Sequence, residues 1–193
     1  MTPGFSAPPL SAYIHFPWCV SKCPYCDFNS HALRGELPEQ QYTDVLLADI
    51  SEELKRSDDR PLVSVFIGGG TPSLIAPDQI ARVVQALRPR LADNAEITLE
   101  ANPGTLDSGH YRGFRDAGIN RLSIGVQSFD DQCLRAIGRI HDASTARAAV
   151  EAALTAGFTR VNLDLMYGLP GQSPQQAQRD VEIACRISPG HIS

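Results

Sequence analysis

The sequence predicts an α/β fold: a partial TIM-like (β/α) barrel of parallel strands. Short runs rich in β-branched and aromatic residues alternate with amphipathic helical stretches, and the chain reaches the start of a sixth strand at 191–193. Strands that alternate with helices pair in parallel through right-handed crossovers. The length of 193 residues fits one domain. A buried strand rarely ends a natural domain, so we expect residues 1–193 to be the N-terminal part of a longer protein, truncated at the sixth strand.

The first half of the chain contains the clearest elements. A strand is expected at 12–16, leading into a loop that carries cysteines. Apolar residues at helical spacing predict a helix over 39–56. The apolar run 62–68 predicts a strand buried on both faces. A glycine-rich turn and a helix over 78–91 follow, and Pro89 should stop or kink that helix near its end.

The alternation continues in the second half. A strand at 95–101 precedes a helix over 106–118, for which Gly118 is the expected C-cap. The remaining elements are expected in this order: a strand at 120–128, helices over 130–138 and 143–157, a strand at 158–168, a helix over 173–187 and the beginning of a strand at 191–193.

Composition excludes several classes of function. The formal net charge of -5 gives no basic surface for nucleic acid or anionic lipid. The chain has no apolar run of membrane-spanning length. The opening segment MTPGFSAPPLSAY lacks the features of a secretory signal, so we expect a cytoplasmic protein. Cys133 and Cys185 stand alone in helical patterns, and we expect both to be small buried hydrophobic residues.

The other three cysteines form one compact motif. Cys19, Cys23 and Cys26 lie in the run CVSKCPYC. Three thiolates can hold three irons of a cubane cluster and leave the fourth iron open to a substrate or cofactor. The alternative is a structural zinc site, which normally closes with four ligands, and His15 or His31 is near enough to supply the fourth.

Polar residues and glycines gather where the predicted strands end. Ligands of parallel β/α folds bind at the carboxyl ends of strands. The run GGGTP, which includes Gly70 and Thr71, lets the backbone approach a ligand closely, although a tight turn would use the same residues. Further candidates are Glu100 and Gln127 at the ends of the third and fourth strands, Asp164 within the fifth strand, and Arg139 on the helical segment after the fourth strand.

These side chains have both functional and ordinary interpretations. A carboxylate closing an apolar strand needs donors such as an ammonium group or sugar hydroxyls, unless the strand end is solvated. The guanidinium of Arg139 suits a carboxylate, whereas an isolated arginine is usually exposed. Tyr13 and His15 share one face of the first strand, which points either toward a cofactor or into barrel packing. Tyr25, between two cysteines, could form a flat wall beside a cofactor.

The assembled pattern resembles the radical S-adenosylmethionine (radical SAM) superfamily. The resemblance rests on CxxxCxxC after the first strand, GGGTP after the second and the partial barrel. More narrowly, the chain is similar to the oxygen-independent coproporphyrinogen III oxidase group, and within it to the HemW-type haem chaperones. The segments that carry this similarity are YIHFPWCVSKCPYCDFNSH, FIGGGTPSL, EANPGT, RLSIGVQSF, GRIH and NLDLMYGLP.

This resemblance implies a 4Fe-4S cluster held by the three clustered cysteines, with S-adenosyl-L-methionine chelated to the open iron. It further implies that the cofactors supply the radical chemistry while the protein supplies position and electrostatics. Arg139 would bind the cofactor's carboxylate. The residues implied as cofactor contacts are Tyr13, Tyr25, Gly70, Thr71, Glu100, Gln127, Arg139 and Asp164.

Two departures from the oxidase pattern favour the chaperone branch. The oxidases carry a further cysteine two residues beyond the third ligand, where this chain has Phe28, and a longer segment before the position of Tyr13. The expected activity is haem binding and transfer to acceptor proteins such as respiratory enzymes, with the haem-binding motif in a region beyond Ser193. An electron donor is a further expected partner. The alternatives are oxidative decarboxylation of coproporphyrinogen III, in porphyrin biosynthesis, and a zinc-stabilised binding module.

Overall fold

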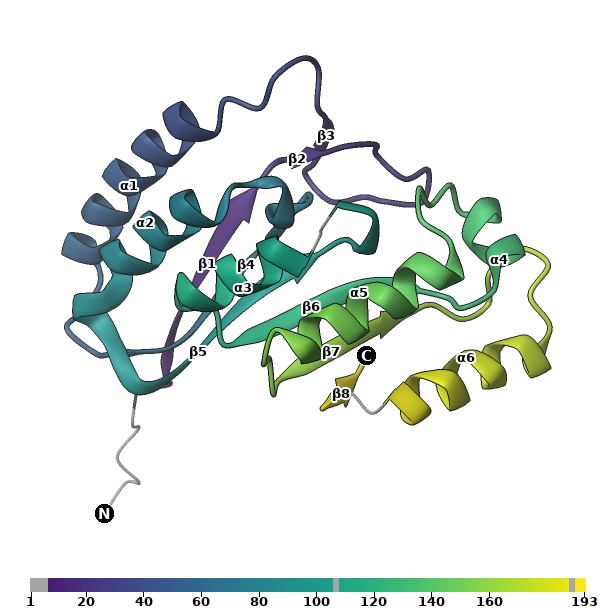
Figure 1. Cartoon of the computed structure of the whole chain (residues 1–193). Coiled ribbons are helices and arrows are strands. Elements are labelled where there is room, and N and C mark those ends of the chain that lie inside the picture. The colour runs from purple at the N-terminus through teal and green to yellow at the C-terminus, as the bar shows by residue number, and fades with distance from the viewer. Residues whose placement is uncertain (1–6, 106–107, 188–189) are drawn as a thin grey trace.

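The computed structural model describes residues 7–105, 108–187 and 190–193. Its core is one six-stranded sheet in the order β1-β4-β5-β6-β7-β8, and every neighbouring pair is parallel (Figure 1). This arrangement confirms the predicted α/β class and the partial barrel. The strands are β1 (Leu10–Phe16), β4 (Leu62–Gly69), β5 (Leu91–Ala101), β6 (Arg121–Gln127), β7 (Val161–Leu165) and β8 (His191–Ile192).

Helices connect the strands and cover one face of the sheet (Figure 1). They are α1 (Glu39–Arg56), α2 (Pro77–Leu87), α3 (Ser108–Asp116), α4 (Asp131–Ala136), α5 (Ala143–Thr155) and α6 (Pro174–Ile187). Three 3₁₀ turns follow strand or helix ends: η1 (Pro72–Leu74), η2 (Arg88–Arg90) and η3 (Pro103–Thr105). None of the helices in the described ranges is long and apolar enough to cross a membrane.

The hydrophobic core lies between the helices and one face of the sheet. Alternate strand residues such as Val65, Leu99 and Ile124 are buried there. The prediction that residues 62–68 are buried on both faces is wrong, because Ser64 and Phe66 on the opposite, concave face are only half-buried. Within the described chain no helix packs on that concave face. Its strands therefore alternate apolar and polar residues instead of being apolar throughout.

Element boundaries mostly agree with the sequence pattern. The helix predicted over 39–56 forms as α1 with those bounds. Helix α2 ends at Leu87, and Pro89 lies in the following 3₁₀ turn, so Leu91 begins β5 instead of ending the helix. Gly118 adopts a positive φ of 104° just after α3, as a C-cap requires. Residues 106–107 of the predicted helix lie outside the described residues.

The two isolated cysteines differ from each other. Cys133 is buried, as expected. Cys185 is exposed, so the prediction for it is wrong. On α6 the buried positions are Asp180 and Ala184, and the next residue along an α-helix is rotated by about 100°. That rotation carries Cys185 to the solvent side.

Candidate functional site

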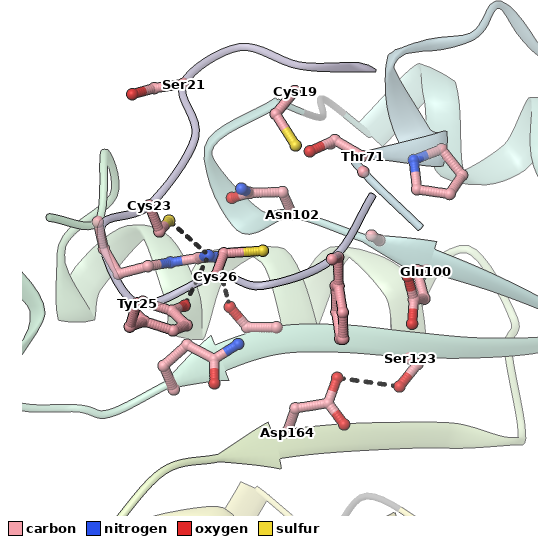
Figure 2. Close-up of a pocket in the computed structure, with 17 residues that line it drawn as sticks. Cys19, Ser21, Cys23, Tyr25, Cys26, Thr71, Glu100, Asn102, Ser123 and Asp164 are labelled. Carbon is pink, nitrogen blue, oxygen red and sulfur yellow. Dashed lines mark hydrogen bonds between the residues drawn. The ribbon is translucent and has the colours of Figure 1, made fainter. Parts of the chain in front are cut away.

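A cavity of about 340 Å³ opens at the carboxyl ends of the strands (Figure 2). Its size lies in the range of small-molecule sites. All the predicted site residues except Tyr13 line it: Cys19, Cys23, Cys26, Tyr25, Gly70, Thr71, Glu100, Gln127, Arg139 and Asp164. Figure 2 shows the three cysteines on one side of this cavity and Glu100, Ser123 and Asp164 on the strands opposite. The tertiary structure therefore brings together residues spread over most of the chain.

Cys23 and Cys26 lie on a loop, residues 20–30, and Cys19 ends the short strand β2 (Trp18–Cys19), which pairs with β3 (His31–Ala32) and closes the loop. The sequence pattern did not predict these strands. The three thiols are free, and all of them face the cavity. Thiolates are the ligands of iron–sulfur clusters, so the donor set fits such a group. Across the described residues, no three His, Cys, Asp or Glu side chains are grouped so as to hold a single metal ion.

The glycine-rich turn packs tightly against the strand that leads to the cysteines. The N–H of Gly70 donates to the carbonyl of Phe16 at 2.6 Å, and the N–H of Thr71 to that of Trp18 at 2.7 Å. A Cβ added at Gly70 would lie 2.4 Å from the Trp18 carbonyl oxygen, so only glycine fits. The tight-turn interpretation is thus correct for these N–H groups. A ligand would have to use the carbonyl oxygens or the Thr71 side chain.

Glu100 is a half-buried carboxyl group on β5, directed at the cavity. Burial raises its pKa to about 7, and the charge of Asp164 adds to this. One hydrogen bond opposes the shift, because the N–H of Gly69 donates to Oε2 of Glu100 at 3.0 Å. Near neutral pH this carboxyl group can therefore exist in either protonation state.

Asp164 is held by donors from three positions. The hydroxyl of Ser123 donates to Oδ2 at 3.0 Å, and the Nδ2 amide of Asn162 and the hydroxyl of Ser193 each donate to Oδ1 at 2.7 Å. These contacts explain how a carboxylate is accommodated within an otherwise apolar strand. They also fix its position in the cavity wall.

Gln127 has a left-handed backbone, with φ of 66°, which is rare for a residue with a side chain. The register between β6 and β7 shifts just before it. The N–H of Met166 donates to its carbonyl at 2.8 Å and helps to hold this conformation. Strain of this kind is typical of functional sites, and here it accompanies an amide on the cavity wall.

Arg139 is not a free surface arginine. Its Nη2 donates to the carbonyl of Gly125 at 2.9 Å, and its Nη1 lies 3.6 Å from the sulfur of Cys23 and 3.4 Å from the hydroxyl of Tyr25. Its buried Nε has no hydrogen-bond partner among the described residues. The neighbouring His141 is buried, which lowers its pKa to about 4, and its Nε2 bonds the carbonyl of Val126 at 3.1 Å.

Tyr13 is not among the residues that line this cavity. It lies on the concave face of β1, where its ring stacks on Phe66 with 6.2 Å between centroids. Its hydroxyl donates to Nδ1 of His15 at 3.2 Å. Burial, followed by the charge of Glu100, raises the pKa of Tyr13. Tyr13 is 58% exposed on this face, so its role as a cofactor contact stays a prediction.

Some lining residues were missed. They are Ser21, Phe28, Pro72, Ala101, Asn102, Ser123 and Gly125. Ser123 and Gly125 could have been found from strand periodicity, because they precede Gln127 by four and two positions and share its face. Phe28 was noted only as a departure from the oxidase pattern, yet this residue is 58% exposed and forms part of the cavity wall.

The comparisons with known proteins agree on one family. The model of the Radical SAM superfamily matches residues 13–184. The chain is 50% identical over 192 residues to the heme chaperone HemW of Haemophilus influenzae, covering 96% of this chain and 50% of that protein. It is 48% identical over 188 residues to HemW of Escherichia coli, covering 96% of this chain and 50% of that protein.

A solved structure supports the fold. Coproporphyrinogen III oxidase (HemN) from Escherichia coli, described as a radical SAM enzyme, superimposes with a TM-score of 0.84 at 32% identity. The match covers 95% of this chain and 44% of the oxidase. The chain thus spans about half the length of the curated relatives it matches.

Proposed function

The chain belongs to the radical SAM superfamily, and from this premise we propose that it is the cluster- and cofactor-binding part of a haem chaperone. Family membership implies a 4Fe-4S cluster and S-adenosyl-L-methionine. In the proposal the cluster is bound by Cys19, Cys23 and Cys26, whose thiols share one cavity. That shared cavity is the observation on which the proposal rests. When bound, the cluster and cofactor would supply one-electron radical chemistry.

The carboxyl and amide groups of the cavity would orient the cofactor. Glu100 and Asp164 offer acceptors for an ammonium group and for ribose hydroxyls, and Gln127 can both donate and accept. Tyr25 would form part of the wall, and Gly70 and Thr71 would contribute backbone and hydroxyl contacts from the opposite side.

Arg139 is the proposed partner of the cofactor's carboxylate. The separations of its Nη1 from Cys23 and Tyr25, 3.6 and 3.4 Å, exceed those of strong charge-assisted hydrogen bonds. A carboxylate could replace both contacts without disturbing the 2.9 Å bond that anchors Nη2 to the carbonyl of Gly125. The side chain is thus oriented by one bond and retains donors for a ligand.

Haem transfer distinguishes the leading proposal from its alternative. Relatives at 35–50% identity are named heme chaperones, and Phe28 stands where the oxidase pattern has a further cysteine. We propose transfer of haem to acceptor proteins such as respiratory enzymes, in the cytoplasm, with an electron donor as a further partner. Coproporphyrinogen III decarboxylation is the second candidate, favoured by the structural similarity to HemN.

The test uses the full-length protein, reconstituted anaerobically with iron and sulfide. We expect about four irons and four sulfides per chain for the proposed cubane, stable haem binding, and haem transfer to an acceptor apoprotein. Coproporphyrinogen III should be left intact when S-adenosyl-L-methionine and a reductant are present. Propionate loss from the porphyrinogen would overturn the chaperone assignment, and a colourless zinc protein without sulfide would overturn the cluster.

A further inference from the structure

The cysteine loop, residues 20–30, depends on side chains for its shape. Within it, the N–H of Cys26 donates to the carbonyl of Cys23 at 3.0 Å, and the N–H of Ser30 to that of Phe28 at 2.7 Å. A loop held by so few backbone bonds would sample many conformations, and ordering it costs conformational entropy. Three thiols must nevertheless be presented together if they are to bind one cluster.

Three consecutive carbonyl groups at the end of the loop are bound by two side chains. The Lys22 ammonium donates to the carbonyl oxygens of Phe28 and Ser30, both at 3.0 Å. Nε2 of His15 lies 2.8 Å from the carbonyl oxygen of Asn29 between them. A carbonyl oxygen only accepts, so Nε2 of His15 carries the hydrogen. Lys22 thus joins the start of the loop to its end, and His15 joins that end to the sheet.

His15 is itself held in place on β1. Its Nδ1 accepts the hydroxyl hydrogen of Tyr13 at 3.2 Å. Its ring also lies so close to Gly69 that an added Cβ there would be 2.7 Å from two ring atoms. Gly69 on β4 and Tyr13 on β1 therefore fix the orientation of His15, which holds the loop.

The type of cation at position 22 matters. The chain has two lysines, Lys22 and Lys55, and its other permanently charged cationic side chains are arginines. An ammonium group is a compact donor with three hydrogens, so it can serve two carbonyls that converge on one point. The planar fork of arginine matches two parallel acceptors instead.

We propose that Lys22, supported by His15, is a positioning residue that arranges the cysteine loop before the cluster arrives. The proposal rests on the proposed cluster site, but the arrangement of the loop is a property of the metal-free chain. Lys22 touches neither cluster nor cofactor in this scheme. It acts through the backbone of residues 28–30.

The test compares full-length Lys22→Met with wild type by hydrogen exchange of the metal-free protein under anaerobic conditions. We expect amides in residues 20–33 to exchange about tenfold faster in the variant, the effect of losing one or two hydrogen bonds. Amides of the sheet should be unaffected. The matched control is Lys55→Met, which removes an exposed lysine on α1 that pairs with Glu52 and should leave the loop unchanged. After reconstitution, the variant should lose iron to a chelator several-fold faster than wild type.

The outcomes separate the two proposals. Loop exchange equal to that of wild type in Lys22→Met overturns the positioning role. Faster loop exchange in a protein whose wild type holds no cluster supports the positioning role and refutes the proposed function. If Lys22→Met no longer melts cooperatively, Lys22→Gln is tested in its place. The glutamine amide keeps a hydrogen-bond donor for one of the two carbonyls. Intermediate loop exchange in that variant supports the proposal, and unchanged exchange overturns it.

Discussion

Glu100 has a pKa that the surrounding structure moves from 4.5 to about 7. Because the folded pKa is raised, the unfolded chain releases this proton first as the pH rises. The folded state therefore loses stability between about pH 4.5 and 7, and the loss is complete above that window. Glu100→Gln removes the titration. We expect the variant to gain stability over wild type as the pH rises from 4.5 to 8, by about 1–3 kcal/mol.

Urea unfolding of the metal-free protein at pH 4.5 and pH 8 measures this change. The control is Glu52→Gln, an exposed carboxylate on α1 whose effect should be small at both values. A difference between Glu100→Gln and wild type that is the same at both pH values would contradict the assigned cause, since only a titrating group changes with pH. The variant should also bind S-adenosyl-L-methionine more weakly.

Gln127 provides a second test at the scale of one residue. At its φ of 66° a side chain is strained, whereas glycine adopts this conformation readily. We expect Gln127→Gly to be more stable than Gln127→Ala by about 1 kcal/mol, the reverse of the usual order inside regular structure. Chemical denaturation of both variants measures the difference. Equal stability would mean that position 127 relaxes to an ordinary conformation.

Sequence reasoning found residues whose chemistry conflicts with their position. Glu100 and Asp164 were detectable because a carboxylate at or within an apolar strand requires an explanation. The sequence could not show which donors surround Asp164, because Ser123 and Ser193 come from other strands or their ends. Tyr13 illustrates the same limit of sequence reasoning. Alternation along β1 identified its face but not how far it lies from the cavity.

At the scale of elements, the connection between α4 and α5 places Arg139. Asp130 caps α4, because its Oδ1 accepts from the N–H groups of Gln132 and Cys133 at 2.9 and 3.0 Å. Its Oδ2 also accepts from Nε2 of Gln176 on α6 at 3.1 Å. These bonds, led by the one from Cys133, lower the pKa of Asp130 below 3.8. The start of α4, the helix that leads into this connection, is therefore capped and bound to α6.

We expect Asp130→Ala to lower the free energy of unfolding by about 1 kcal/mol at neutral pH, the usual value of an N-cap. Asp130→Asn is the matched variant, since asparagine caps nearly as well. The folded pKa is depressed, so the stabilisation is present above pH 3.8 and disappears as the pH falls through the folded value. Thermal melts at pH 7 and pH 3 check both statements. An alanine variant as stable as wild type at pH 7 would show that the cap contributes little.

The elements that sequence patterns predicted best are the amphipathic helices, because their apolar spacing is a local property. Helix α1 has the predicted bounds. Strands β2 and β3 could not be predicted, since each has only two residues and exists through pairing across the cysteine loop. The strand expected over 158–168 shortens to Val161–Leu165, because pairing with β6 and β8 defines its ends.

At the scale of the whole molecule, the six-stranded sheet is open, with β1 and β8 as its edge strands. The alternation of strands and helices predicted the parallel order, but only the structure shows which surfaces stay uncovered. Strand β1 forms one edge over seven residues, and beside it lies an apolar groove of about 560 Å³ shared with α1. Open strand edges and apolar grooves favour association between chains.

On the proposal that the chain is one part of a haem chaperone, residues 1–193 alone should aggregate or lose the proposed cluster more readily than the longer protein. Size-exclusion chromatography with light scattering, followed by iron and sulfide determination, measures both properties on the two proteins prepared in parallel. Among the described residues no strand pairs with the outer edge of β1, and this provides the physical reason, since a strand of a second copy can pair there. A monomeric fragment with a sharp cooperative melt and full cluster content would contradict this prediction. It would mean that the groups at the β1 edge are satisfied by solvent, and that the six-stranded sheet alone is enough to hold the cysteine loop.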